Sequence, residues 1–188
     1  MNNTLYLFVG QSGSGKTTIT NHLESTYNYK GVQSYTTRPQ RYEGETGHVF
    51  VTDEEFNRLT DIVAYTDYNS FRYCATAQQL DKANMYVIDV PGVEYLLEKY
   101  SNTERRIVIF YFDSNTQTRV LRMIDRGDSD ANIVSRLLQD GEDNWFEQLE
   151  GLCNKYSTKF NNLDVYKINA NKNAKLVLEQ VESYIFPF

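Results

Sequence analysis

The feature that most constrains this chain is a glycine-rich loop between a short apolar run and a helical segment. Residues 10–17 read Gly-Gln-Ser-Gly-Ser-Gly-Lys-Thr, which satisfies the phosphate-loop pattern G-x-x-x-x-G-K-[ST]. The apolar run TLYLFV precedes the loop at 4–9, and helix-compatible residues follow it from 16 to 27. Glycines let consecutive backbone N–H groups point inward, and the helix N-terminus adds its positive dipole end. We therefore expect a strand, an anion-binding loop and a helix.

This loop predicts a binding site for ATP and Mg²⁺. The ammonium of Lys16 supplies a point charge for the β- and γ-phosphates, and the hydroxyl of Thr17 is the expected metal ligand. The expected nucleotide-binding residues are Gly10, Ser12, Gly13, Ser14, Gly15, Lys16, Thr17 and Thr18.

Composition limits the class of protein. The chain has 188 residues, enough for one folding unit, with 40% hydrophobic and 23% charged residues. No apolar run approaches the roughly 18 residues of a membrane span, and the N-terminus lacks the features of a signal peptide, so we expect a cytoplasmic protein. The net charge of −6 argues against general nucleic-acid binding. Cys74 and Cys153 form neither a metal-binding spacing nor a disulfide framework.

Strand-like and helix-like segments alternate along much of the chain. Short apolar runs with many β-branched residues predict buried strands, and the segments between them are typical of helices. This alternation predicts an α/β fold with a parallel sheet flanked by helices. The expected strands are 4–9, 85–90, 106–112 and 164–168, and the expected helices are 16–27, 92–100, 116–126, 130–156 and 173–184.

Two stretches interrupt the alternation. From 34 to 81 the chain carries turn residues, a strand-like piece at 48–52, and capping-box patterns at Thr52–Glu55 and Thr76–Gln79. We interpret this stretch as an inserted subdomain. From 116 to 139 an arginine-rich helix is expected to break at Arg126-Gly127 and to restart near Asp130, which we interpret as a lid. The core would then comprise about 1–33, 82–115 and 140–188 of a single domain.

The inserted stretch resembles the GMP-binding region of guanylate kinases, a family of P-loop nucleoside monophosphate kinases. Residues 34–41 read Ser-Tyr-Thr-Thr-Arg-Pro-Gln-Arg, and the segment 50–56 ends in Glu-Glu-Phe. Further similarity lies at Tyr-Cys-Ala-Thr (73–76), at Val-Ile-Asp-Val-Pro-Gly (87–92) and at Arg-Gly-Asp (126–128). The resemblance covers most of the chain and implies a core, an acceptor-binding subdomain and a lid.

The resemblance also implies residue roles. Lys16, Arg126 and Arg136 would act on the transferring phosphoryl group, and Asp89 would lie near the acceptor and the metal. Arginines suit this chemistry because their planar guanidinium groups bind phosphate bidentately and neutralise its charge. Arg38 and Arg41 could instead belong to a solvated basic turn, and Asp89 could instead be a helix cap. Arg122 either joins the lid or is solvated. The expected acceptor-binding residues are Ser34, Arg38, Arg41, Glu45, His48, Tyr73 and Asp89.

The sequence departs from the family in the acceptor region. Gly44 stands at the place of an acidic residue, so Glu43 or Glu45 would replace it, and His48 stands at the place of a tyrosine. The glutamate and the hydroxyl residue that read the guanine edge would fall at Ala64 and Ala75. An unpaired buried N–H donor costs about 1–3 kcal/mol, so a guanine pocket needs such an acceptor.

The acceptor therefore stays open. GMP or dGMP is the default, with Asp67, Thr66 or Thr76 supplying the base contact from a shifted register. Another nucleotide and a phosphorylated sugar such as ribose 1,5-bisphosphate are the alternatives. On the donor side, Asn169 or Asn171 would approach the adenine or cap the last helix.

Two other function classes compete with the kinase. Guanylate kinase-like domains also exist as protein-interaction modules, and a nucleotide sensor with slow turnover is a third reading. Interaction modules usually have a degraded phosphate loop, whereas Lys16 and Thr17 are both present here. We therefore expect a phosphotransferase that acts on a small-molecule nucleotide.

Overall fold

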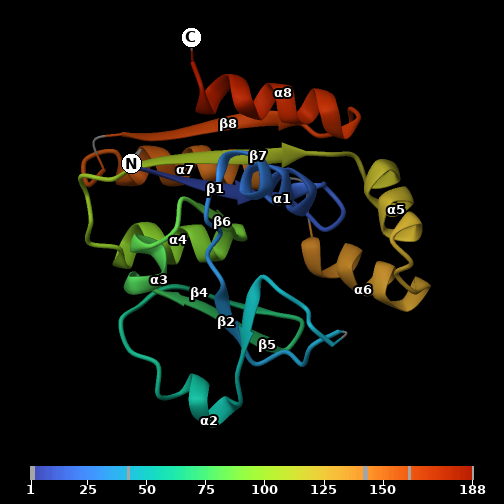
Figure 1. Ribbon diagram of the computed structural model, residues 1–188, viewed down its shortest axis with the longest axis horizontal. Helices are drawn as coiled ribbons and strands as arrows, with labels where there is room; N and C mark the ends of the chain where they lie inside the picture. The colour runs from blue at the N-terminus through green and yellow to red at the C-terminus, as the bar shows by residue number, and fades with distance from the viewer. Residues whose placement is uncertain (1–2, 42, 142–143, 161, 188) are drawn as a thin grey trace.

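Four parallel strands form the main sheet of the molecule (Figure 1). The computed structural model describes residues 3–41, 43–141, 144–160 and 162–187. The strand order is β6-β1-β7-β8, and each neighbouring pair is parallel. The predicted α/β class is thereby confirmed. The strands are β1 (Thr4–Val9), β6 (Met85–Val87), β7 (Arg106–Asp113) and β8 (Leu163–Asn169).

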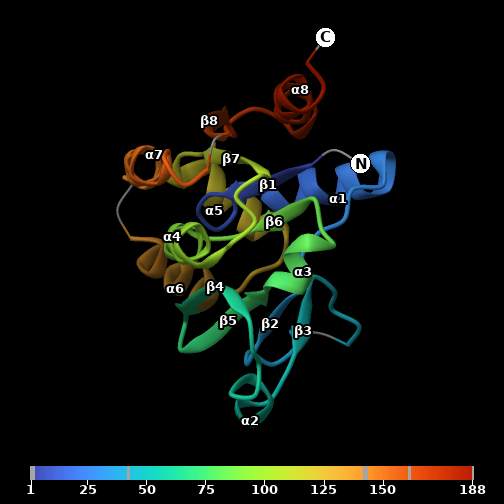
Figure 2. The ribbon, with the colours of Figure 1, turned by 90° about the vertical axis from the view of Figure 1, so that its left-hand side faces the viewer.

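Helices cover both faces of this sheet (Figure 2). α1 (Lys16–Tyr27) and α8 (Ala174–Ile185) lie on one face, and α4 (Val90–Lys99) and α7 (Trp145–Tyr156) lie on the other. All six residues of β1 are buried, because successive side chains of a strand point to opposite faces. This explains why β1 reads as a continuous apolar run in the sequence.

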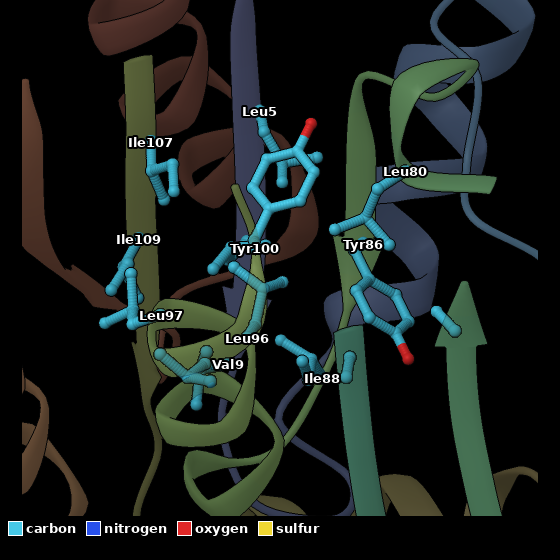
Figure 3. Close-up of a cluster of buried hydrophobic side chains, with 14 of the residues drawn as sticks. Leu5, Val9, Leu80, Tyr86, Ile88, Leu96, Leu97, Tyr100, Ile107 and Ile109 are labelled. Atoms are coloured by element: carbon cyan, nitrogen blue, oxygen red, sulfur yellow. The ribbon is translucent and has the colours of Figure 1, made fainter. Parts of the chain in front are cut away.

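The α4 face holds the larger apolar core (Figure 3). Leu96 and Leu97 of α4, and Tyr100 directly after it, are at most 1% exposed, and they pack toward β1 and β7 (Figure 3). Burial of one leucine of this size stabilises the fold by about 1.5–3 kcal/mol. The core therefore fixes the sheet, and with it the loop that leaves the carboxyl end of β1.

The segment between β1–α1 and β6 forms a second sheet with the order β3-β2-β5-β4. In Figure 1 it lies below the main sheet, with α2 at its far end. Both predicted capping boxes are present: Glu55 caps the start of α2 with Thr52, and the Oε1 of Gln79 accepts a hydrogen bond from the Thr76 backbone at 3.0 Å. The elements are β2 (Ser34–Thr36), β3 (His48–Phe50), α2 (Asp53–Phe56), β4 (Ile62–Tyr68), β5 (Phe71–Thr76) and α3 (Ala77–Asp81).

The arginine-rich segment forms two helices, α5 (Thr116–Asp125) and α6 (Asp130–Asp140). The chain turns between them at Gly127, whose φ is +85°, so the predicted break is confirmed. A conformation with positive φ favours glycine because it has no Cβ.

Two sequence predictions of element boundaries were wrong. One helix over 130–156 was expected, but α6 ends at Asp140 and α7 begins at Trp145. The strand expected over 85–90 ends at Val87, because the carboxylate of Asp89 accepts a hydrogen bond from Gly92 N and starts α4 at Val90. None of the helices in the described ranges is long and apolar enough to cross a membrane.

Arg105 joins the end of the inserted segment to the start of β7. Its side chain is buried, and its Nη1 donates a hydrogen bond to the carbonyl of Leu80 at 2.6 Å. Its Nη2 donates to the carbonyl of Ala83. One guanidinium thus donates hydrogen bonds to two carbonyls at the C-terminal end of α3.

Replacing Arg105 with methionine is expected to lower the free energy of unfolding by about 2–4 kcal/mol, because two carbonyls lose a buried guanidinium donor. The Leu80 carbonyl still accepts a hydrogen bond from the Ala83 N–H. Urea denaturation measures this loss. Arg106→Met is the matched control: its ion pair with Asp164 is 2.8 Å long but about half exposed, so the expected loss is below about 1 kcal/mol. Equal losses in both variants would contradict the role of Arg105.

Candidate active site

The phosphate loop follows β1 directly and is held against the rest of the core. Gly10, Gly13 and Gly15 have φ values of +154°, +79° and +96°. A Cβ at Gly13 would lie 2.6 Å from the carbonyl oxygen of Arg119, and one at Gly10 would lie 2.9 Å from that of Phe112. At Gly10 and Gly13 a side chain is therefore excluded both by the close contact and by the positive φ.

Lys16 occupies the inside of this loop. Its Nζ donates hydrogen bonds to the carbonyls of Gly10 and Gln11, at 2.5 and 3.0 Å, and to the Oγ of Ser14 at 3.2 Å. Burial of the ammonium lowers the pKa of Lys16 to about 8; the carboxylate of Asp140 opposes this effect, and nearby arginines reinforce it. A desolvated cation at a helix N-terminus suits a polyphosphate anion.

A cleft of about 1150 Å³ connects the loop with the second sheet and the arginine-rich helices. Most predicted site residues line it. Gly10, Arg38, Tyr73 and Asp89 are the predicted residues that do not. Those that line it are Ser12, Gly13, Ser14, Gly15, Lys16, Thr17, Thr18, Ser34, Arg41, Glu45, His48, Arg126 and Arg136.

Glu45 organises the arginines on the second-sheet side. Its Oε1 accepts a hydrogen bond from Arg38 Nη2 at 2.8 Å, and its Oε2 accepts one from the backbone N–H of Arg41 at 2.7 Å. Burial raises the pKa of the Glu45 carboxyl, but these hydrogen bonds outweigh it and hold the pKa below its usual value. Arg38 is buried, which excludes the solvated basic turn for this residue. Its Nε is buried and has no hydrogen-bond partner among the described residues.

His48 stands beside Ser34 and Tyr73 on the second sheet. Its Nδ1 lies 2.9 Å from the Oγ of Ser34, and its ring centroid lies 5.6 Å from that of Tyr73. Burial, reinforced by the charge of Arg38, lowers the pKa of His48. The imidazole is therefore neutral near pH 7 and able to donate or accept one hydrogen bond.

Asp89 contacts the second sheet from the core. Its Oδ2 accepts a hydrogen bond from the Oγ1 of Thr66 at 2.7 Å, while its Oδ1 caps α4 through Gly92. Burial raises the pKa of Asp89, although these hydrogen bonds and Lys16 oppose the shift. The structure thus shows the helix cap, and the role of Asp89 toward acceptor and metal stays a prediction.

Arg122, Arg126 and Arg136 bring the charges of α5 and α6 to the cleft. Arg122 donates to the carbonyls of Ser14 and Lys172, at 3.1 and 3.0 Å, so it contacts the phosphate loop directly. Arg126 and Arg136 lower the pKa of Lys16 by their charge. The cleft therefore gathers cations from the loop, from the second sheet and from both helices.

Comparisons with known proteins find similarity to kinases. No protein-family model matches the chain. It is 29% identical over 145 residues to a guanylate kinase of Bacteroides thetaiotaomicron, covering 71% of each protein. It is 27% identical over 161 residues to a uridine kinase of Staphylococcus haemolyticus, covering 73% of this chain and 77% of that one. A crystal structure of guanylate kinase from Anaplasma phagocytophilum matches 98% of this chain and 86% of its own, with a TM-score of 0.54 and 16% identity.

The chain thus resembles guanylate kinases in sequence and in fold. The resemblance inferred from the sequence is confirmed by these matches, and so is the fold that it implied.

The chain departs from the guanylate kinase pattern at the two positions to which the resemblance assigns guanine reading. Ala64 and Ala75 face each other across β4 and β5 and are 1% and 0% exposed. Both belong to the apolar cluster of the α4 face. Neither a carboxylate nor a hydroxyl is available at these two positions to accept a hydrogen bond from a base.

Sequence analysis missed a buried ion pair beside the loop. Arg119 and Asp140 have side chains 4% and 2% exposed, with Nη1 3.0 Å from Oδ2. The same Oδ2 accepts a hydrogen bond from the backbone N–H of Ser12 at 2.8 Å. The hydroxyl of Tyr68, from β4, lies 3.3 Å from the Oγ of Ser12. These contacts span 21 to 128 residues, so no local pattern signals them.

The expected donor-side asparagines are placed differently. Asn173, not Asn169 or Asn171, caps α8 through Leu176 N at 3.1 Å. Asn173 also lines the cleft, whereas Asn169 and Asn171 do not. The Oδ1 of Asn171 instead accepts a hydrogen bond from Asn115 N at 2.9 Å. The expectation of a cap at Asn169 or Asn171 was wrong.

Asp140→Ala is expected to lower the free energy of unfolding by about 3–5 kcal/mol, because it leaves the Arg119 guanidinium buried without its counter-ion. Urea denaturation measures the loss. The double variant Arg119→Met/Asp140→Leu removes both charges and should be more stable than Asp140→Ala alone. A double variant that is less stable than the single one would contradict this account.

Proposed function

We propose that this chain is a nucleoside monophosphate kinase that transfers the γ-phosphoryl group of ATP to a nucleotide acceptor. One observation carries the proposal: a single cleft is lined by Lys16 of the phosphate loop, by Arg41 of the connection between β2 and β3, and by Arg126 of the helical segment. Phosphoryl transfer requires that two anions be positioned and that their charge be neutralised. The sequence similarity to a guanylate kinase and to a uridine kinase supports the same class.

The donor side fits ATP with Mg²⁺. The glycine conformations, the partly buried Lys16 and the start of α1 would hold the phosphates. Thr17, exposed in the first turn of α1, would place its hydroxyl on the metal. Mg²⁺ is commonly bound by one or two protein oxygens together with substrate phosphates, where it neutralises charge on the β- and γ-oxygens.

The acceptor side fits a phosphate monoester. Ser34, Arg41 and His48 line the cleft on the second-sheet side, and Glu45 pairs with both Arg38 and Arg41. Ser34, His48 and Tyr73 lie on the same part of the second sheet. We propose that residues 34–81 act as the acceptor subdomain and 116–139 as the lid, with the core comprising about 1–33, 82–115 and 140–188.

In the proposed reaction an oxygen of the acceptor phosphate attacks the γ-phosphorus, and the bond to the β–γ bridging oxygen breaks. The products are ADP and a nucleoside diphosphate. Lys16, Arg126 and Arg136 would stabilise the charge on the transferring group, since guanidinium groups pair bidentately with phosphoryl oxygens. These three are the proposed catalytic residues. The proposed place of action is the cytoplasm.

GMP and dGMP are the first acceptors to test, because the matched kinases include guanylate kinases. Ala64 and Ala75 favour a second candidate, a nucleotide sensor or interaction module with weak turnover, because the guanine edge would lack an acceptor. A phosphorylated sugar such as ribose 1,5-bisphosphate is the third, since it offers the phosphate without a base.

A coupled ADP-release assay with Mg·ATP separates these candidates. The panel contains GMP, dGMP, the other ribo- and deoxynucleoside monophosphates, and ribose 1,5-bisphosphate. Turnover with a nucleotide is expected, and Lys16→Ala and Arg126→Ala should each lose it while far-UV circular dichroism stays unchanged. Full activity in either variant would refute its role, and ATP binding without turnover on any acceptor would favour the sensor.

ATP binding is expected to weaken as the pH rises above about 8. Lys16 loses its proton as the pH rises through its pKa of about 8, and the neutral amine no longer attracts the phosphates. The affinity should stay level from pH 7 to 7.5 and then fall by up to about tenfold per pH unit. Calorimetric titration with ATP measures this profile. Lys16→Arg keeps its charge in this range and should give a level profile, whereas a level wild-type profile up to pH 9.5 would contradict the prediction.

A further inference from the structure

Asp128 lies between the two lid arginines at the turn that joins α5 to α6. Its Oδ1 accepts a hydrogen bond from the Nε of Arg126 at 3.0 Å, and its Oδ2 accepts one from Nη2 of the same guanidinium at 2.5 Å. The Nε of Arg136, from α6, lies 3.7 Å from that Oδ2. One carboxylate thus pairs with both arginines that are proposed to act on the phosphoryl group.

The backbone holds Asp128 in this place. The N–H of Gly127 donates to the carbonyl of Ile124 at 2.8 Å, and the N–H of Asp128 donates to the carbonyl of Met123 at 3.0 Å. These bonds close the end of α5 in a tight turn. The side chain of Asp128 is 16% exposed, whereas that of Arg126 is 53% exposed. The carboxylate is therefore the fixed partner, and the Arg126 guanidinium is the more exposed one.

The positive charge of a third arginine also acts on the carboxylate of Asp128. The hydrogen bond from Arg126 lowers the pKa of Asp128, and the charges of Arg136 and of Arg41, from the connection between β2 and β3, act in the same direction. All four side chains line the cleft that contains Lys16. Asp128 is thus an anion at the point where arginines from three segments converge.

A carboxylate and a phosphoryl group present similar oxygen pairs to a guanidinium. Both accept two parallel N–H···O bonds from one arginine. An arginine that binds Asp128 with its Nε and Nη2 therefore cannot offer the same two groups to a phosphate at the same time.

We propose that Asp128 is the resident counter-ion of the lid arginines, which it holds in the cleft and releases when the γ-phosphate takes its place. The inference rests on the proposed function, because it needs Arg126 and Arg136 to meet that phosphate. Asp128 is a positioning residue that acts through these arginines. The exchange makes arginine engagement depend on the γ-phosphate, so ATP and ADP are distinguished at the lid.

The test compares ATP and ADP affinities of wild type and Asp128→Asn by calorimetric titration. The amide keeps the shape but loses the charge, so Arg126 and Arg136 are no longer held. ATP is expected to bind about threefold to tenfold more tightly, the size of a charge-assisted contact of a partly exposed arginine. ADP affinity should change less than about twofold, because the γ-phosphate is missing.

Asp125→Asn is the matched control. Asp125 lines the same cleft, and no hydrogen bond or ion pair is recorded for its carboxylate within the described ranges. It therefore removes the same charge without releasing an arginine. A gain for ATP in Asp125→Asn as large as in Asp128→Asn would overturn the inference, since the general field would then explain both.

A double variant tests the route through the arginine. The ATP affinity of Arg126→Ala/Asp128→Asn is compared with that of Arg126→Ala. The gain produced by Asp128→Asn in this background should be less than half of its gain in the wild-type background. A gain that persists in full in the Arg126→Ala background would overturn the inference. Weaker ATP binding by both Asp128→Asn and Asp128→Ser, at the wild-type melting temperature, would also overturn it. Wild-type protein that binds no ATP would overturn the proposed function as well, and so the two failures are distinguishable.

Discussion

The close packing of the phosphate loop against β7 and α5 is the constraint on which the site depends. Gly10 and Gly13 have no room for a Cβ, because the carbonyl oxygens of Phe112 and Arg119 lie within 3 Å of its position. The loop is therefore shaped by core elements that are distant in the sequence. The same enclosure desolvates Lys16 and lowers its pKa, so the protein holds this charge in a state that an incoming polyanion stabilises.

Three carboxylates pair with arginines in or near the cleft, and these ion pairs differ in burial. Asp140 and Arg119 form a buried pair that fixes Ser12 of the loop. Glu45 orders Arg38 and the Arg41 backbone on the second sheet, and Asp128 holds Arg126 at a half-exposed position. Because breaking a buried pair costs far more than breaking an exposed one, the first two are scaffold. The third is the contact that exchanges most readily with a ligand.

Local patterns predicted the first strand, the phosphate loop and its helix, because the glycine spacing and the flanking apolar run are contiguous. The capping boxes and the break at Gly127 were predictable for the same reason. Boundaries set by distant contacts were not: α6 ends where Asp140 meets Arg119 and Ser12, and β6 ends early because Asp89 turns to Thr66 and caps α4. Most of the predicted site residues line the cleft, some predicted from the phosphate-loop motif and the others from the family resemblance. Asp128 belongs to the Arg-Gly-Asp stretch of that resemblance, but no role was predicted for it, and the pairing of Asp140 with Arg119 was found only in the folded chain.

The residues proposed to bind phosphate are different from those at the positions where a base would be read. The arginines need only charge and a fixed carboxylate partner, so they tolerate change in the rest of the second sheet. Base reading needs a polar atom at a defined place, and here Ala64 and Ala75 fill that place as part of the apolar core that also contains Leu80 and Ile88. Introducing a carboxylate at Ala64 would bury a charge in this core, which costs several kcal/mol unless it is paired. Under the proposed function, this packing favours an acceptor that is recognised chiefly through its phosphate and through the Ser34, His48 and Tyr73 side of the sheet.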